Sequence, residues 1–326
     1  MIRIGLAGCS GHYSSALDVI AKDPELRLVG FAKTHPLEET ARAHKHPAFQ
    51  NHTRTCVSIE ELLEQELDLL IVDAIYGLHG SICLQAAKRG IGIYCEKPVA
   101  TSLEELELLE RLVTEYELPF GCMLDTRTHP LVQQAKVLIH QGAIGEVALA
   151  YGQKTYRFGR RPSWYNDPLL YGGTILWVAI HAIDWTRYVT GKEFSQVQAH
   201  SQNLLPDYPN LDSSGTLQFE FVQGGSAVIS YDFFRPLSAR THGDDRLRIV
   251  GTKGSVEARL DEGFFELVTD SPPTAHFDDD TSMFTRFAAY LKGQAPAPIQ
   301  AWDIFETTRW ALCAQLSTKL NQPIKR

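Results

Sequence analysis

The chain contains 326 residues, of which 44% are hydrophobic and 21% charged, and its net charge is -8 at pH 7. This length exceeds what one hydrophobic core usually serves, and the composition is that of a folded globular protein, so a disordered chain is excluded and two domains are favoured. The acidic balance argues against a nucleic-acid-binding protein, and no apolar run approaches the roughly 18 residues that a membrane helix needs.

The first 120 residues alternate short apolar runs with amphipathic segments, a pattern typical of parallel strands joined by crossover helices. Two of the amphipathic segments begin with a capping box, Ser58 with Glu61 and Ser102 with Glu105, which predicts a helix start at each place. We therefore predict an α/β fold with a doubly wound parallel sheet of the Rossmann type over residues 1–122. Its six strands are predicted at Ile2–Ala7, Leu26–Ala32, Thr55–Val57, Leu69–Asp73, Gly92–Cys95 and Leu118–Leu124.

Residues 123–326 are predicted to form a second α/β domain that serves substrate binding and oligomerisation. Its alternating strands are separated by Gly-containing turns, which indicates an antiparallel sheet. The last helix is expected to pack back on the first domain. Helices are predicted at Pro130–Gln141, Gly173–Val189, Ser282–Leu291 and Ala301–Leu320, and strands at Val147–Thr155, Thr216–Phe221, Ser226–Phe233, Arg246–Val250 and Ser255–Leu260.

The six cysteines are scattered, without a C-x-x-C pair, so the sequence predicts reduced thiols and no metal site. The acidic run 278–280 precedes a predicted helix and is interpreted as stabilising the helix dipole. Met1 leads directly into an apolar strand-like run, which leaves no room for a secretory signal, so a cytoplasmic location is expected.

A glycine loop lies where the first strand turns into the first helix, the place at which a Rossmann domain binds the diphosphate of a dinucleotide. Gly8, Ser10, Gly11 and His12 are the candidate contacts. The glycine spacing is imperfect, because the usual second and third glycines fall on Ser10 and Tyr13. A tight strand-to-helix turn without a ligand is an equal alternative.

Cofactor choice in such a domain is set at the end of the second strand, where a carboxylate binds the ribose hydroxyls and a cation accommodates a 2′-phosphate. The segment Phe31–His35 contains no acid, whereas Lys33 and Thr34 are present. These two residues favour NADP(H) over NAD(H), the alternative being that Lys33 is a solvated surface lysine.

The run Tyr94-Cys95-Glu96-Lys97-Pro98 resembles the motif of the Gfo/Idh/MocA family of oxidoreductases. The resemblance extends to His79, to the segments 142–146 and 172–173, and to His181 and Asp184. It implies a Rossmann domain followed by a domain with a large, open, mostly antiparallel sheet, and redox chemistry at a hydroxyl carbon of a sugar, inositol or related compound.

By this resemblance Lys97 is the acid/base that exchanges the hydroxyl proton as hydride moves. Glu96 is expected to orient Lys97 or to contact the cofactor, and Lys97 itself, Tyr76 and His79 are further candidate cofactor contacts.

The sequence departs from the family at its second catalytic element, an Asp-x-Gly-x-His segment. Here the stretch is Trp177 to His181, so the histidine is kept while a tryptophan, which cannot transfer a proton, stands in place of the aspartate. Asp125, at the end of the last predicted strand of the first domain, is a candidate replacement, with a cap or a salt bridge to Arg127 as the alternative. His181 is a candidate catalytic residue, with a histidine satisfied within the core as the alternative. Asp184 could orient His181, or it could stabilise the helix or an interface.

The segment 156–165 carries aromatic and arginine side chains suited to a sugar-like and possibly anionic ligand. A solvated arginine run is the alternative. The candidate substrate contacts are Lys97, Asp125, Arg127, Arg157, Trp164, Tyr165, Trp177 and His181.

Three functions remain open on the sequence. The first is an NAD(P)-dependent dehydrogenase or reductase for a secondary hydroxyl or carbonyl of a sugar or polyol. The second is a cofactor-binding regulator or pseudoenzyme, which Trp177 keeps open. The third is an enzyme that retains its cofactor and uses transient oxidation to drive elimination or hydrolysis. A homodimer or homotetramer through the second sheet is expected by analogy of fold.

Overall fold

The computed structural model describes residues 1–270, 279 and 281–326, and the acidic run 278–280 therefore lies largely outside the described residues. The chain divides into two compact units. The first unit comprises residues 1–124, 169–172 and 281–309. The second comprises 125–168, the described part of 173–280, and 310–326. The sequence-based division at residue 122/123 thus lies close to the first crossover, while two later segments join the first unit.

The first unit is built on a six-stranded parallel sheet in the order β3-β2-β1-β4-β5-β6, the strand order of a doubly wound dinucleotide-binding fold. All residues of β4 and β5 are buried, as expected for central strands covered on both faces. The strands are β1 (Ile2–Ala7), β2 (Leu26–Ala32), β3 (Arg54–Cys56), β4 (Leu69–Val72), β5 (Gly92–Cys95) and β6 (Phe120–Cys122).

Both predicted helix starts are confirmed, since Ser58 and Ser102 accept hydrogen bonds from the backbone N–H of Glu61 and Glu105. Helix α3 packs on α4 and α1 packs on α8. The helices of this unit are α1 (Tyr13–Ile20), α2 (Ile59–Leu63), α3 (His79–Ala87), α4 (Leu103–Glu115) and α8 (Met283–Leu291), with short turns η1 (Ala43–Lys45) and η2 (Tyr76–Leu78).

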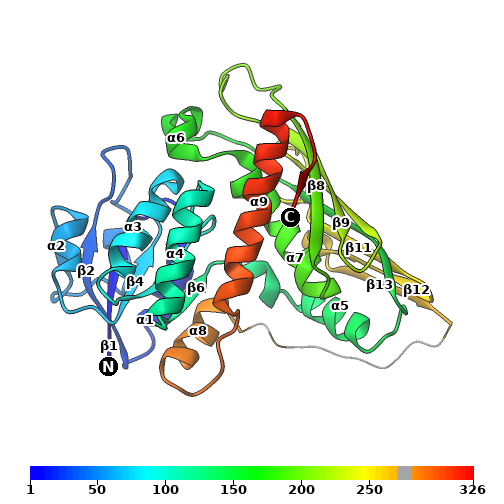
Figure 1. The fold of residues 1–326 in the computed structure, drawn as a ribbon. Helices are drawn as coiled ribbons and strands as arrows, with labels where there is room; N and C mark the ends of the chain where they lie inside the picture. The colour runs from blue at the N-terminus through cyan, green and yellow to red at the C-terminus, as the bar shows by residue number, and fades with distance from the viewer. Residues whose placement is uncertain (271–278, 280) are drawn as a thin grey trace. The chain divides into compact units, whose positions relative to one another are not determined.

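The second unit is built on an eight-stranded sheet, within the described residues, in the order β13-β12-β11-β7-β10-β9-β8-β14 (Figure 1). The sheet is mixed, because β7 and β10 pair in parallel while the other neighbours are antiparallel. Its strands are β7 (Val147–Thr155), β8 (Phe194–Gln202), β9 (Ser214–Phe221), β10 (Ser226–Asp232), β11 (Arg246–Gly251), β12 (Gly254–Arg259), β13 (Phe264–Thr269) and β14 (Ile324–Lys325).

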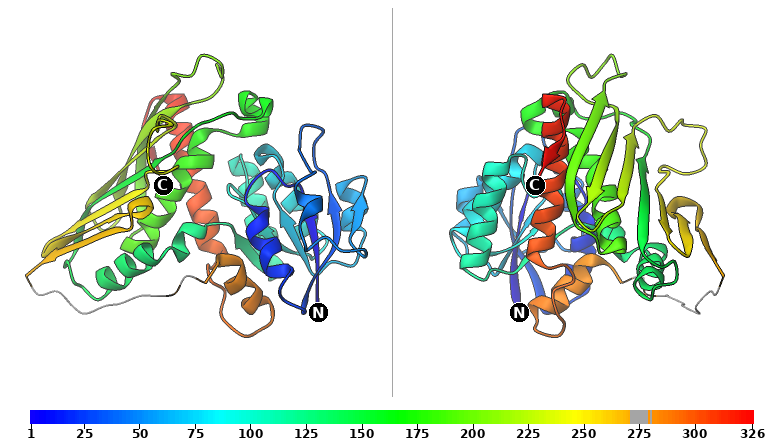
Figure 2. Two further views of the ribbon diagram at one scale, coloured as in Figure 1. Left: turned by 180° about the vertical axis from the view of Figure 1, so that it is seen from behind. Right: turned by 45° about the vertical axis from the view of Figure 1, so that its right-hand side comes forward.

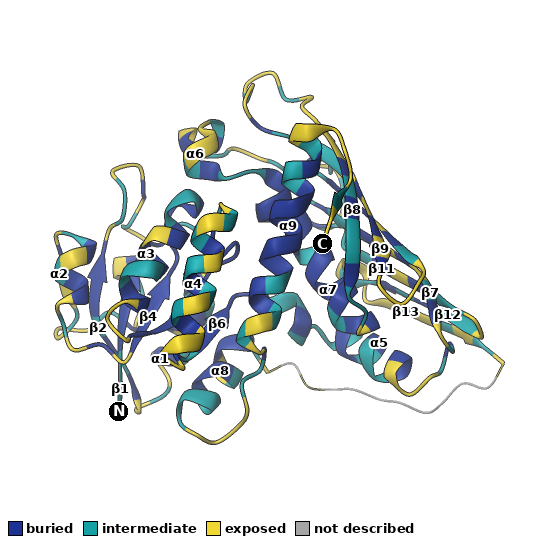
Figure 3. Cartoon of the chain, viewed as in Figure 1, coloured by how far each residue is buried: buried dark blue, intermediate teal, exposed yellow. Residues whose placement is uncertain are grey.

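Helices α5 (Pro130–His140) and α7 (Ile180–Thr190) pack together, and α7 lies against β7, β10 and β11 (Figure 2). Most of α7 is buried (Figure 3), and Gly191 ends the helix with a φ of 63°, in the left-handed region that glycine adopts without strain. The short helices η3 (Asp125–Thr128), η4 (Ser163–Asn166), α6 (Pro168–Tyr171) and η6 (Leu260–Glu262) lie in the connections.

The helix predicted at Gly173–Val189 is only partly correct. Residues Ile175–Ala179 form a π-helical turn, η5, and regular α-helix begins at Ile180. Such turns widen the helix by one residue and often occur at functional sites. In this chain the turn carries Trp177.

The last long helix, α9 (Ala301–Leu320), contributes to both units. Its first part belongs to the Rossmann unit, where Phe305 stacks on Phe120 with ring centroids 4.8 Å apart. Its second part belongs to the sheet unit, where Trp310 meets Phe194 and Phe219 edge to face. No helix in the described part of the chain is long and apolar enough to cross a membrane.

Candidate active site

The loop between β1 and α1 requires glycine at residue 8. Gly8 has a φ of +78°, and a Cβ there would lie 2.7 Å from both the carbonyl oxygen of Asp73 and the Oε1 atom of Glu38. The strain and the crowding both exclude a larger residue. At Gly8 the predicted glycine loop therefore lies close to the backbone of Asp73 and Ala74 and to the carboxylate of Glu38.

The backbone donors at the start of α1 point at carboxylates of the chain itself. The N–H of Gly11 donates to Oδ1 of Asp73, and the N–H of His12 donates to Oε2 of Glu96 at 3.0 Å. The His12 ring also contacts Oε2 of Glu96 through Nδ1. Because a helix start is where an anion is best stabilised, Asp73 and Glu96 use the donors that a diphosphate was expected to use.

These two carboxyl groups are fully buried but differ in charge. Burial, and then the charge of Glu96, raises the pKa of Asp73 well above its usual value. Burial also acts to raise the pKa of Glu96, but the positive charges of His12 and Lys97 outweigh it and lower that pKa to about 2. The pair therefore has Glu96 ionised and Asp73 favouring the neutral acid.

A carboxylate that was not predicted from the sequence lies in the loop after β2. Glu38 is only 5% exposed, and it accepts hydrogen bonds from the hydroxyl of Ser10 at 2.9 Å and the N–H of Thr34 at 2.7 Å. Lys33 is exposed, and its Nζ donates to the carbonyl of Pro36 at 3.0 Å. Phe31–His35 itself contains no acid, but the chain folds back and brings Glu38 from beyond this segment to the N–H of Thr34. The acidic pair at residues 38 and 39 was the available signal.

Lys97 follows β5, and its side chain is 1% exposed. Its backbone N–H donates to Oε1 of Glu96 at 2.8 Å, and its Nζ lies 3.9 Å from the same oxygen. The carboxylate of Glu96 thus lies between Lys97 and His12, whose side chain is 55% exposed. This arrangement holds a buried ammonium group at the carboxyl edge of a Rossmann sheet, where such folds bind ligands.

The two other predicted cofactor contacts of this unit are buried. His79 lies within hydrogen-bond distance of the carbonyls of Ala74 and Pro98, at 2.9 and 2.8 Å, and joins the loops after β4 and β5. Burial lowers its pKa, which favours the neutral ring. Tyr76 packs edge-on against His79. Both side chains support the edge of the sheet.

In the second unit, Arg127 and Asp184 form a buried ion pair. The guanidinium of Arg127 donates through Nε and Nη2 to the carboxylate of Asp184, with distances of 2.6–3.1 Å, and both side chains are nearly inaccessible to solvent. This pairing ties η3 to α7, so Arg127 has a structural partner. Asp125 begins η3, half-buried, and its carbonyl accepts a hydrogen bond from Thr128.

Trp177 lies in an aromatic cluster. Its indole N–H donates to the hydroxyl of Tyr156, whose pKa is raised because burial and neighbouring Tyr165 disfavour the anion. Arg161 lies over the rings of Tyr156, Phe158 and Tyr165 at 5.4–5.6 Å from their centroids. The position that carries aspartate in the family motif therefore donates a fixed hydrogen bond here.

The other predicted substrate contacts of this unit differ in their burial and in their contacts with the rest of the chain. Trp164 and Tyr165 are buried against each other, with ring centroids 4.4 Å apart. Arg157 donates to the carbonyls of Pro236 and Ala239 and so holds a loop. His181 is half-buried near the start of α7.

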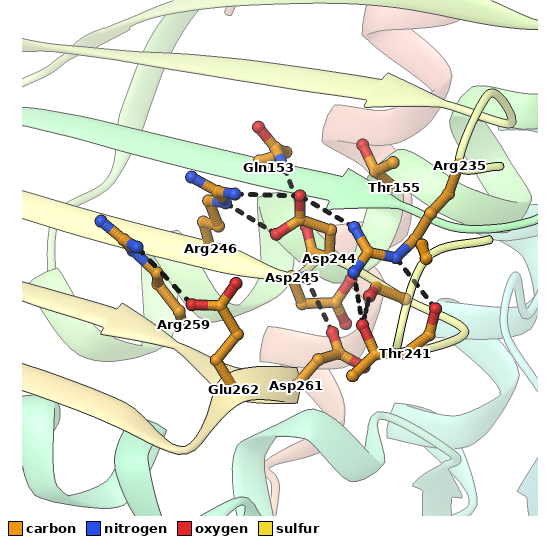
Figure 4. A network of polar contacts seen from close by, with 12 residues as sticks. Gln153, Thr155, Arg235, Thr241, Asp244, Asp245, Arg246, Arg259, Asp261 and Glu262 are labelled. Carbon is orange, nitrogen blue, oxygen red and sulfur yellow. Dashed lines mark hydrogen bonds and ion pairs between the residues drawn. The ribbon is translucent and has the colours of Figure 1, made fainter.

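A polar network surrounds the loop that precedes β11 (Figure 4). Asp244 accepts from Arg246 at 2.7 and 3.0 Å and pairs with Arg235 at 3.2 Å. Asp261 accepts from the N–H of Asp245 at 2.9 Å. These contacts tie the loop before β11 to its neighbours. Among the described residues, no group of three or more His, Cys, Asp or Glu side chains could hold a metal ion.

Comparison with known families agrees with this geometry. Residues 2–122 match the model described as "Oxidoreductase family, NAD-binding Rossmann fold", and residues 132–257 match the "GFO/IDH/MocA C-terminal domain". The chain belongs to the Gfo/Idh/MocA family of oxidoreductases. The resemblance on which Lys97, Glu96 and the open sheet were interpreted is confirmed.

Similar proteins align with different shares of this chain. A solved structure from Thermotoga maritima, described as an oxidoreductase, is 32% identical over 100% of both chains with a TM-score of 0.92. A levoglucosan dehydrogenase of Pseudarthrobacter phenanthrenivorans is 30% identical over 60% of this chain and 50% of its own length. An NAD(+)-dependent scyllo-inositol 2-dehydrogenase of Bacillus subtilis is 28% identical over 60% of this chain and 56% of its own length. The matches thus span about half the length of these two curated relatives.

Proposed function

We propose that the protein is an NAD(P)-dependent dehydrogenase or reductase that acts on a secondary hydroxyl or carbonyl of a sugar, polyol or related small molecule. The observation that carries this proposal is the buried ammonium group of Lys97 beside Glu96, at the carboxyl end of β5. The names of the levoglucosan and scyllo-inositol dehydrogenases support this substrate class.

The cofactor supplies the acceptor or donor of hydride. Lys97 supplies the proton transfer, because in its neutral form it takes the proton of the substrate hydroxyl and in its charged form it returns it to a carbonyl oxygen. Glu96 holds the Lys97 side chain from one of its oxygens and His12 from the other. By resemblance to the family, His181 assists, and Asp125 is the candidate for the missing aspartate.

One observation within the Rossmann unit supports the binding of a dinucleotide there. The Oδ2 atom of Asp73 is buried at the glycine loop and has no hydrogen-bond partner among the described residues. A buried polar atom of this kind is costly unless a ligand satisfies it. Gly11 lies beside this carboxyl group, where a Cβ would be 3.2 Å from Oδ1 of Asp73, and Gly8 lies against the backbone of the same residue.

The cofactor preference depends on two opposing side chains. Lys33 and Thr34 favour the 2′-phosphate of NADP(H), as the sequence indicates. Glu38 opposes it, because its carboxylate follows β2 and accepts from the N–H of Thr34, near the place where an acid binds the ribose hydroxyls in this fold. The Glu38 carboxylate is buried and Lys33 is exposed, so solvent screens the lysine more strongly. We therefore favour NAD(H), in place of the NADP(H) indicated by the sequence.

Replacing Glu38 by glutamine is expected to improve NADPH binding relative to NADH binding by about tenfold, since it removes a like charge near the 2′-phosphate. The glutamine keeps the shape of the side chain and can still accept from Ser10. Fluorescence titration of both reduced cofactors measures the ratio. Glu39→Gln, an exposed neighbour, is the control. An unchanged ratio would remove Glu38 from cofactor selection.

The dehydrogenase proposal itself is tested with a panel of sugars and polyols, following reduction of NAD⁺ and NADP⁺. Substrate-dependent formation of reduced nicotinamide supports it. Bound cofactor without turnover of any substrate would favour the regulator, for which the specific observation is Trp177 in place of an acid. Bound cofactor with turnover but no net redox would favour elimination or hydrolysis.

We also propose that a homodimer or homotetramer forms through the second sheet. Leu149, Tyr151 and Val228 are 39–43% exposed on neighbouring strands β7 and β10. Apolar surface of this kind favours burial against a second copy. Light scattering of the purified protein tests the assembly.

A further inference from the structure

We propose that Asp73 binds the diphosphate of the dinucleotide as a neutral carboxylic acid, donating a hydrogen bond from Oδ2, so that cofactor binding is linked to a proton. This inference rests on the proposed function and concerns the same site. It assigns a role to a residue that neither the sequence motif nor the glycine loop singles out.

The geometry of Asp73 leaves one carboxyl oxygen without a hydrogen-bond partner among the described residues. The N–H of Gly11 donates to Oδ1, and the N–H of Tyr13 donates to the same carboxyl group. The side chain is fully buried, and Oδ2 has no partner among the described residues. An ionised carboxylate would leave a charged oxygen unsatisfied in this position, whereas a neutral acid carries there a hydroxyl that can donate. A phosphate oxygen can accept a hydrogen bond from this hydroxyl.

The surroundings of Asp73 are negative on several sides. Glu96 faces it from the end of β5 and Glu38 from the loop after β2. Cys9 lies in the glycine loop, and its pKa is raised to about 12 by burial and by the charges of Glu38 and Asp73. Tyr13 faces it from α1. The positive charges of His12 and Lys97 are engaged by Glu96.

This charge distribution sets the sign of the pH dependence. If Asp73 were ionised, a diphosphate with two negative charges would enter a site that already holds the charges of Asp73, Glu96 and Glu38. If Asp73 is neutral, one repulsion is removed and one hydrogen bond is gained. The neutral form therefore binds more tightly, and affinity must fall as the pH rises through the pKa of Asp73.

The experiment is a fluorescence titration of the full chain with NADH and NADPH between pH 6 and about 9.5. For the natural protein we expect the Kd of both cofactors to rise by up to about tenfold per pH unit above the pKa of Asp73. Asp73→Asn keeps a donor and cannot ionise, so its Kd should be independent of pH in this range and at least as low as that of the natural protein at high pH. Asp73→Ala should also be independent of pH but bind more weakly than Asp73→Asn.

Calorimetry in two buffers of different ionisation enthalpy provides a second measurement that does not depend on a variant. We expect net proton uptake on binding to the natural protein at high pH, and none with Asp73→Asn. Asp18→Asn, an exposed change of the same kind on α1, serves as the control.

The outcomes separate the inference from the function on which it rests. Binding whose pH dependence is the same in Asp73→Asn as in the natural protein, or without proton uptake, would overturn the role of Asp73 alone. Failure of the natural protein and of all variants to bind either cofactor at any pH would overturn the proposed function as well.

Discussion

Replacing Lys97 by methionine is expected to lower kcat by about 10²–10⁴-fold, the usual contribution of a general acid or base. Methionine preserves most of the apolar volume of a side chain that is 1% exposed, so the loss reports the missing proton transfer more than a change in packing. Because Lys97 acts on the substrate proton, cofactor affinity should change far less than kcat. Steady-state kinetics with the best substrate of the panel, together with cofactor titration, measures both.

Lys97→Arg is the control variant that keeps the positive charge of Lys97. It keeps a cation beside Glu96 but cannot give up its proton near neutral pH, so we expect it to be nearly as inactive as Lys97→Met. Full activity in Lys97→Arg would show that Lys97 contributes only its charge. Turnover of Lys97→Met at the natural rate would show that Lys97 is not the acid/base.

The fold was predictable because local pattern and tertiary environment agree in most of its elements. β1, β2, β5 and β7 lie at their predicted bounds. In β1, β2 and β5 the strand is followed directly by glycine or a charged residue. β8 was missed because its inward residues Phe194, Val197 and Ala199 are diluted by polar neighbours, and β13 because half of an edge strand remains exposed. The parallel pairing of β7 with β10 depends on contacts distant in sequence, which a strand pattern does not encode.

The position of the site in the fold could be predicted from the sequence, but the hydrogen-bond partners of its residues could not. The glycine loop and the Glu-Lys-Pro turn follow from local sequence, because each occupies a fixed place after a strand. Asp73 was counted only as the end of a strand, although a carboxyl group closing an apolar run at the sheet edge was a signal. Its closeness to Gly11, like that of Glu38 to Ser10, arises from folding of segments 28 to 62 residues apart.

Arg127 is another residue whose partner could not be predicted from the sequence. The sequence placed it among the candidate substrate contacts, whereas in the structure its guanidinium pairs with Asp184, 57 residues away. The two predictions for Asp184, orientation of His181 and structural stabilisation, are both compatible with this pair, but the bidentate geometry favours the structural role. A guanidinium with a buried carboxylate partner has less capacity to bind a substrate anion.

Replacing Arg127 by methionine is accordingly expected to destabilise the second unit by about 3–5 kcal/mol, because it leaves the charge of Asp184 buried without its partner. It also removes the guanidinium from the ring of Tyr188, 4.8 Å from its centroid. Urea unfolding followed by tryptophan fluorescence measures the loss, since Trp185 and Trp310 both lie in the core of this unit.

The double variant Arg127→Met with Asp184→Leu distinguishes the two roles of Arg127. If the cost comes from the unpaired carboxylate, removing both charges should recover most of the lost stability, as it does when apolar residues replace a buried ion pair. If Arg127 instead binds the substrate, the double variant should be stable but show a raised KM. A stable single variant with a raised KM would contradict the structural role, because only a ligand contact would then have been lost.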